Sequence, residues 1–182
     1  MFFRPASNLL VPFMQPQFRR GRAAAGGGGG PDVYYDIETS ANANANRSSN
    51  SSLAFWQTVT VTTGGSATKV RWYCRAYYGG TETVEVALYD SAGTSLLASG
   101  SGSVTGTGYK DIIFDTPATV ASATDYIIAT AFNGGSAELG FNSAAGTYSL
   151  DTNAGGSASF PFATLAADST PAGKLVMGVY ID

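Results

Sequence analysis

The chain contains no histidine. Because histidine is the commonest general base and a frequent transition-metal ligand, no Ser-His-Asp or Cys-His arrangement can form within these residues. Cys74 is the one cysteine, which excludes an internal disulfide. Its position among alternating apolar residues favours a place in the core over a reactive thiol. We therefore expect no hydrolase chemistry of those kinds, no cofactor and no metal.

Charge is also scarce. Charged residues make up 13% of the chain, about half of the usual share of roughly 25%. The formal charge of -3 is unevenly divided, because residues 1–22 hold four arginines and no acid while the rest holds six bases and 13 acids. There is no dense basic run and no recognisable nucleic-acid-reading module, so nucleic-acid binding is not expected.

Long uninterrupted apolar runs are missing as well. A secretory signal needs an apolar stretch of roughly 7 to 15 residues. Pro5, Asn8, Pro12, Gln15 and Pro16 divide the first residues into shorter fragments. We expect neither a secretory signal nor a membrane-spanning segment.

What is present divides the chain into three parts: residues 1–22, an Ala/Gly-rich linker over 23–31, and residues 32–182. Prolines keep the first part from becoming helical, so we predict an extended arm that docks on a partner. The linker holds five consecutive glycines but lacks the Gly-Lys-Ser/Thr ending of a phosphate loop, which favours a hinge. The arm residues predicted to dock are Phe2, Phe3, Arg4, Leu9, Leu10, Val11, Phe13, Met14, Phe18, Arg19, Arg20 and Arg22, and the hinge is Gly26, Gly27, Gly28, Gly29 and Gly30.

After Pro31 the pattern is typical of short strands separated by Gly, Ser, Asn and Asp clusters. Residues 40–52 show no apolar periodicity and are predicted to form a long loop. Eight or nine strands without a convincing helix predict an antiparallel sandwich. The predicted strands are Val33–Glu38, Leu53–Thr63, Thr68–Tyr78, Thr83–Asp90, Ser95–Ser99, Tyr109–Asp115, Asp125–Phe132, Ala137–Asn142 and Lys174–Ile181.

Alternation assigns faces within these strands. Val70, Trp72 and Cys74 are expected in the core, with a basic and aromatic face opposite. The short turn over residues 78–81 predicts that the strands on its two sides pair as an antiparallel hairpin, with Glu82 or Glu85 across from Arg75 or Arg71. The apolar last strand is expected to be central and paired on both sides.

A resemblance is carried by Leu88-Tyr89-Asp90, the turn Ser91-Ala92-Gly93-Thr94, Leu96-Leu97-Ala98-Ser99, the turn Gly106-Thr107-Gly108-Tyr109, and Thr124-Asp125-Tyr126. These elements resemble a recurrent jelly-roll module, similar to carbohydrate-binding and galactose-binding-like sandwiches and to domains of bacteriophage virion proteins. The resemblance implies an all-β antiparallel jelly-roll β-sandwich, here preceded by an extended arm.

Three groups of residues could carry further chemistry. Asp90, Asp111, Asp115, Asp125, Asp151 and Glu138 supply carboxylates for a glycosidase, but most lie at strand ends or turns, so we expect no enzyme. Asp32, Asp36 and Glu38 alternate along one strand, which fits a solvated face better than a calcium site. Tyr73, Tyr77, Tyr78, Tyr109 and Tyr148 are expected to contact either a glycan or another subunit.

Together these observations predict a bacteriophage virion accessory protein: a head decoration, head fibre or tail-associated protein at the particle surface. The arm would bind capsid or tail proteins, and a homotrimer is the first expectation for the assembly. The alternative is a carbohydrate-binding module or receptor-binding tail-fibre domain that recognises surface glycans.

Overall fold

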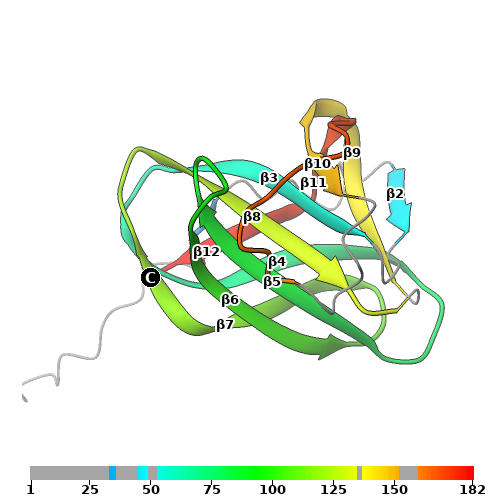
Figure 1. The fold of residues 1–182 in the computed structure, drawn as a ribbon. Coiled ribbons are helices and arrows are strands. Elements are labelled where there is room, and N and C mark those ends of the chain that lie inside the picture. Colours follow the sequence, from blue (N-terminus) through cyan, green and yellow to red (C-terminus); the bar gives the residue numbers. More distant parts are fainter. Residues whose placement is uncertain (1–32, 36–44, 49–52, 135–136, 152–159) are drawn as a thin grey trace, which may run out of the picture.

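The computed structural model describes residues 33–35, 45–48, 53–134, 137–151 and 160–182, and these ranges contain strands and no helix (Figure 1). The strands form two antiparallel sheets that pack as a sandwich, so the predicted all-β fold class is confirmed. Sheet A contains β1 (Val33–Tyr35), β2 (Ala45–Ser48), β4 (Gly65–Tyr77), β7 (Gly108–Val120), β9 (Ala137–Thr147), β11 (Ala172–Leu175) and β12 (Met177–Ile181). Sheet B contains β3 (Ala54–Val61), β5 (Glu82–Asp90), β6 (Leu96–Val104), β8 (Thr124–Phe132) and β10 (Ser149–Asp151).

The strand order is that of a jelly roll. In sheet A the neighbours run β1, β12, β4, β7, and in sheet B they run β3, β8, β5, β6. Successive strands therefore pass repeatedly from one sheet to the other, as in the two interleaved Greek keys of that fold. The remaining strands β2, β9, β10 and β11 are additions, and β9, β10 and β11 project above the sandwich in Figure 1.

The main core lies between the two sheets. Val70, Trp72 and Cys74 are fully buried, which confirms the face predicted for this strand. The Trp72 indole of sheet A meets the Phe132 ring of sheet B edge to face, with 5.3 Å between ring centroids. Phe55 packs against the same Phe132 ring at 6.1 Å. The Trp72–Phe132 pair joins the two sheets across the core, whereas Phe55 and Phe132 both belong to sheet B.

The predicted hairpin between β4 and β5 is wrong. β4 pairs with β7, β12 and β9 in sheet A, whereas β5 pairs with β6 and β8 in sheet B. The connection over residues 78–81 crosses from one sheet to the other, which lie about 10 Å apart in sandwiches. Alternation indicates which face of a strand is buried but not which strand lies beside it. Glu82 and Glu85 consequently do not lie across from Arg75 and Arg71.

Two further predictions need correction. Residues 40–52 were expected to form a loop, but they include β2, which pairs with β9. The missing apolar pattern did not reveal this strand, because ladder hydrogen bonds use the backbone and need no apolar side chains. The expected single strand Lys174–Ile181 is divided at Val176 into β11 and β12. Of these, β12 is paired on both sides, with β1 and β4, as predicted.

Val176 marks the point where the last strand changes neighbours. Its N–H donates to the Gly140 carbonyl on β9 (3.0 Å), and its own carbonyl accepts from the Tyr73 N–H on β4 (2.9 Å). The buried Gln57 side chain, which reaches across the core from sheet B, bonds the backbone on both sides of this point. Its Oε1 accepts from the Leu175 N–H (2.8 Å) and its Nε2 donates to the Met177 carbonyl (3.0 Å).

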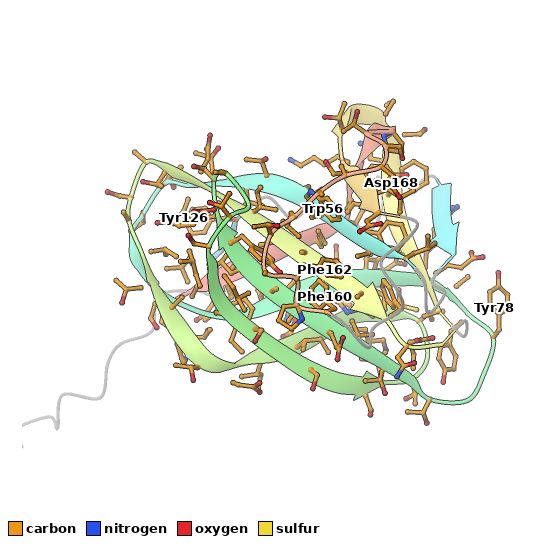
Figure 2. The ribbon with its side chains drawn as sticks, in the orientation of Figure 1. Trp56, Tyr78, Tyr126, Phe160, Phe162 and Asp168 are labelled. Atoms are coloured by element: carbon orange, nitrogen blue, oxygen red, sulfur yellow. The ribbon has the colours of Figure 1, made fainter. Side chains whose placement is uncertain are left out.

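Part of the outer face of sheet B is covered by the chain itself. Phe160 packs there with Trp56 and Tyr89 over a floor of small alanines, and the partly buried Phe162 and Leu165 extend the cover. The Tyr89 hydroxyl donates to the Phe162 carbonyl (2.9 Å). Figure 2 shows Phe160, Phe162 and Trp56 over this sheet. Residues 160–165 therefore cover the part of this face formed by β3, β5 and β8, while Thr58 and Thr60 on the same face are exposed.

We predict that Gln57→Leu lowers the free energy of unfolding by about 2 to 5 kcal/mol. The substitution leaves the Leu175 N–H and the Met177 carbonyl without the Gln57 side chain in the core, and each buried polar group left without a partner costs about 1 to 3 kcal/mol. Urea unfolding of the purified protein measures the change. Thr58→Leu, at the exposed neighbouring position, is the matched control and should stay within about 0.5 kcal/mol. Equal effects of both variants would contradict this role of Gln57.

Candidate functional site

The outer face of sheet A carries a continuous group of aromatic and charged side chains. The strand register places Tyr34 beside Tyr180, and Tyr180 beside Lys69. In the neighbouring rows Arg71 lies opposite Asp111, and Tyr73 lies opposite Tyr109. We call this group the tyrosine–cation surface; it consists of Tyr34 on β1, Tyr180 on β12, Lys69, Arg71 and Tyr73 on β4, and Tyr109 and Asp111 on β7.

Asp111 is the polar centre of this surface. Arg71 binds it through two hydrogen bonds, from Nε to Oδ1 (2.6 Å) and from a terminal nitrogen to Oδ2 (2.8 Å). Lys69 Nζ and the Tyr34 hydroxyl both donate to Oδ2 at 3.3 Å. A two-pronged arginine contact of this kind fixes both side chains in orientation. Asp111 and its three partners come from three different strands, β7, β4 and β1, so the network depends on the fold of sheet A.

Each cation also lies over tyrosine rings. Lys69 Nζ is 4.5 Å from the Tyr180 ring centroid and 5.4 Å from that of Tyr34. The Arg71 guanidinium carbon is 4.2 Å from the Tyr34 centroid and 5.8 Å from that of Tyr109. On β12 the residue opposite Arg71 is Gly178, whose missing side chain leaves room for the guanidinium. Cation–π contacts thus hold the rings and the charges together.

The end of the surface formed by Tyr73 and Tyr109 is open to solvent. Tyr109 is 41% exposed, and its ring lies 5.1 Å from that of Tyr73 at an angle of 58°. Ile113, which follows on the outer face of β7, is 69% exposed. Exposed tyrosine rings offer apolar faces for stacking, and their hydroxyls, together with the charged groups beside them, offer hydrogen bonds. Such a site can hold a flat, partly apolar and hydroxylated ligand.

The network shifts the ionisation of its members. Burial acts to raise the pKa of the Asp111 carboxyl, but the hydrogen bonds and charges of Arg71 and Lys69 outweigh it and hold the pKa below its usual range. Burial raises the pKa of the Tyr34 hydroxyl, against the opposing hydrogen bond of Lys69. Tyr34 therefore stays protonated and can donate to Asp111 at neutral pH.

Of the five tyrosines predicted to contact a glycan or a subunit, Tyr73 and Tyr109 lie in this surface. Tyr77 and Tyr78 lie at the end of β4 and outside it: the Tyr77 hydroxyl donates to the Gly80 carbonyl and that of Tyr78 to Glu138 Oε1 (2.8 Å). Tyr78 is exposed at the tip of the turn, far from Phe160 and Phe162 in Figure 2. Tyr148 is 2% exposed and packs against Phe55 and Phe141, so its predicted surface role is wrong.

The other predicted sites have different outcomes. The docking arm, the glycine hinge and the group Asp32, Asp36 and Glu38 all lie outside the described residues. Cys74 is buried, and burial raises the pKa of its thiol, which confirms the predicted place in the core. Among the described residues no group of three or more Cys, Asp or Glu side chains could hold a metal ion. The same residues include no helix long and apolar enough to cross a membrane.

The sequence did not single out Tyr34, Lys69, Arg71 or Tyr180 as site residues, and it named Asp111 only among the carboxylates available to a glycosidase. The basic and aromatic face predicted for the strand Thr68–Tyr78 was a signal for Lys69, Arg71 and Tyr73. The place of Asp111 depends on the pairing of β4 with β7, and that of Tyr34 on the pairing of β1 with β12. Both pairings join segments distant in sequence, which local alternation does not reveal.

These features define a class: a jelly-roll sandwich with one outer face partly covered by its own chain and the other bearing a tyrosine–cation surface. Residues 38–171 match the family described as a domain of unknown function, DUF4082. The match covers well over half of the chain, and the chain belongs to this family. The matched range excludes β1, β11 and β12, so Tyr34 and Tyr180 lie outside it. A comparison with curated proteins finds no match.

We predict that the stabilising effect of Asp111 depends on pH. Its pKa is lowered by folding, so its contribution is complete above the unfolded value of about 3.9 and is lost as pH falls below that value. Asp111→Asn should therefore lower the free energy of unfolding near pH 7, by less than about 1 kcal/mol because the pair is partly solvated, and should have little effect near pH 2. Urea unfolding across this pH range measures the difference; a cost that is constant or grows on acidification would contradict the proposed pairing.

Proposed function

We propose that this protein is a non-catalytic accessory protein of a bacteriophage virion, whose jelly roll recognises surface glycans through the tyrosine–cation surface. The proposed glycan recognition rests on the difference between the outer faces of the two sheets. Residues 160–165 cover part of sheet B, whereas on sheet A Tyr109 of the tyrosine–cation surface and Ile113 farther along β7 are exposed. An exposed aromatic group on a rigid sheet is suited to a ligand.

A glycan fits the chemistry of this surface. Sugar rings present apolar C–H faces that stack on aromatic side chains, and hydroxyls that exchange hydrogen bonds with charged groups. Tyr73 and Tyr109 supply the rings, and Arg71 and Asp111 supply fixed polar partners beside them. Because the ion pair is already formed, its side chains lose little freedom on binding, which favours affinity. A protein partner would also use such residues, and the test below distinguishes the two.

Four of the carboxylates considered for a glycosidase are engaged in hydrogen bonds or ion pairs, which supports a binding role over a catalytic one. Asp90 accepts hydrogen bonds from Thr94 and Ser95, and Asp111 is neutralised by Arg71 and Lys69. Asp125 accepts from Thr60 (2.6 Å) and Glu138 from Tyr78 (2.8 Å). These four carboxylates are engaged within the fold, whereas a glycosidase needs a facing pair free to exchange protons with a substrate. Asp115, of the same predicted set, has no hydrogen-bond or ion-pair partner among the described residues and is not engaged in this way.

The virion setting rests on the sequence. Residues 1–22 combine four arginines with aromatic and aliphatic side chains that they cannot bury by themselves, and a run of glycines separates them from the jelly roll. A basic, apolar segment on a flexible linker is suited to docking on a larger assembly, where several copies act together. The resemblance to virion modules agrees with capsid or tail proteins as the partners and with a homotrimer as the displayed unit.

We predict that Tyr109→Ala weakens glycan binding at least about fivefold. The substitution removes the most exposed ring of the surface, and stacking on an aromatic ring is worth about 1 to 3 kcal/mol. Binding is measured on an array of bacterial surface polysaccharides and then by calorimetry on the best ligand. Tyr78→Ala is the matched control, since Tyr78 is 69% exposed but lies outside the surface.

The control variant should bind like the wild type. If no polysaccharide binds to the wild-type protein, the recognition role is refuted. If Tyr78→Ala weakens binding and Tyr109→Ala does not, glycans bind elsewhere on the molecule.

We predict that deletion of residues 1–30 abolishes incorporation into particles while the jelly roll stays folded, because every described strand begins at or after Val33. Particle occupancy is measured by quantitative mass spectrometry of purified virions, and folding by circular dichroism. The matched control replaces Gly26 to Gly30 with serines, which keeps both the arm and a flexible linker. Wild-type occupancy of the truncated protein would refute the docking role of the arm.

A further inference from the structure

A groove runs along the side of the sandwich where β6 meets β7. It consists of two adjoining hollows of about 120 Å³ and 200 Å³, which share Ser99 and Asp115. The first hollow is bounded by Glu85, Ser101 and the segment Phe160–Pro161, and the second by Leu96, Leu97 and Thr116. Four separate parts of the chain, β5, β6, β7 and the segment Phe160–Pro161, thus line one groove.

Small residues let this groove form. A Cβ atom added at Gly100 would lie 2.0 Å from the Ile113 carbonyl oxygen, and one added at Gly102 would lie 3.0 Å from the Ile112 side chain. Glycine at both positions lets β6 approach β7 closely and closes this side of the core. Alternation along β6 then turns Ser99 and Ser101 outward, so hydroxyls line the groove at the joint between the two sheets.

The groove combines polar groups with apolar walls. Within the described part of the chain, the Asp115 carboxylate forms no hydrogen bond and no ion pair. The buried Oε2 atom of Glu85 likewise lacks a hydrogen-bond partner among the residues described, and burial raises the pKa of this carboxyl. Beside them Leu96 and Leu97 are 42% and 38% exposed. Buried polar atoms normally have partners, so the Glu85 oxygen can accept a donor from a ligand in the groove, and the exposed Asp115 carboxylate beside it is accessible to the same ligand.

The groove lies next to the tyrosine–cation surface on the same strand. Tyr109, Asp111, Ile113 and Asp115 occupy alternate positions of β7 and point to the same outer face. At a rise of about 3.4 Å per residue, the distance from Tyr109 to Asp115 is about 20 Å. A single ligand that follows β7 can therefore contact both ends, whereas one sugar unit at Tyr109 does not reach Asp115.

We propose that the ligand of this protein is an extended oligosaccharide that stacks on Tyr109 and follows β7 into the groove, where Asp115, Glu85 and the serines of β6 accept and donate hydrogen bonds to its hydroxyls. This inference rests on the proposed glycan recognition and adds a second subsite to it. A linear sugar chain suits the groove because it has donors for unpaired carboxylate oxygens and apolar faces for the leucine side chains.

The test measures binding as a function of ligand length. Malto-, cello- and chito-oligosaccharides of one to six units are titrated by calorimetry into the full-length protein and into Asp115→Ala, Tyr109→Ala and Thr119→Ala. Thr119 is exposed on β7 beyond the groove, and its variant is the matched control. In the wild type we expect affinity to rise with length until the ligand spans the two subsites.

Asp115→Ala should weaken the longest oligosaccharides about fivefold to tenfold, since hydrogen bonds to a charged group are lost, and should leave the short ones unchanged. Tyr109→Ala should weaken all lengths, and Thr119→Ala none. If oligosaccharides bind through Tyr109 but Asp115→Ala has no effect, or an equal effect at every length, the second subsite is refuted while glycan recognition stands. If no oligosaccharide binds, or a basic peptide occupies the groove instead, the inference is wrong.

Discussion

The structure depends on how the last strand changes neighbours at Val176. Before this residue the strand pairs with β9, and after it with β4 and β1. Gln57 secures the change from across the core, because it binds the backbone of Leu175 and Met177 with its two side-chain atoms. This fixes the register of β12, which places Gly178 opposite Arg71 and Tyr180 opposite Lys69. A hydrogen-bonded amide in the core thus determines which side chains meet on the surface.

On that surface, charge and aromatic packing support each other. Asp111 holds Arg71 and Lys69 in place, and each cation lies over tyrosine rings that come from other strands. Alone, a partly exposed ion pair contributes little to stability. Its effect here is geometric, because it fixes the orientation of the groups beside Tyr109. The opposite outer face differs, since residues 160–165 cover its part over β3, β5 and β8, whereas no described segment covers Tyr109 and Ile113 on sheet A.

Local patterns in the sequence predicted the strands and their buried sides well, because alternation directly reflects which side chains leave water. Trp72, Cys74 and Met177 are core residues for this reason. Pairings between distant strands were not predictable in the same way, so the bond between Arg71 and Asp111 and the cover over Tyr89 were both missed. The predicted strand Ser95–Ser99 was shorter than β6, because Gly100 and Gly102 have low strand propensity. Glycine occupies these positions because β7 approaches β6 closely there.

The central claim is that the outer face of sheet A is the recognition face. The most direct test is an NMR titration that follows the backbone amide signals of the full-length protein as a bacterial surface polysaccharide fragment is added. The account predicts that the largest shifts fall on residues 69–73 of β4 and 109–115 of β7, with residues 160–165 affected only where they border the groove. Shifts centred on the outer face of sheet B, or on the turn over residues 78–81, would contradict it.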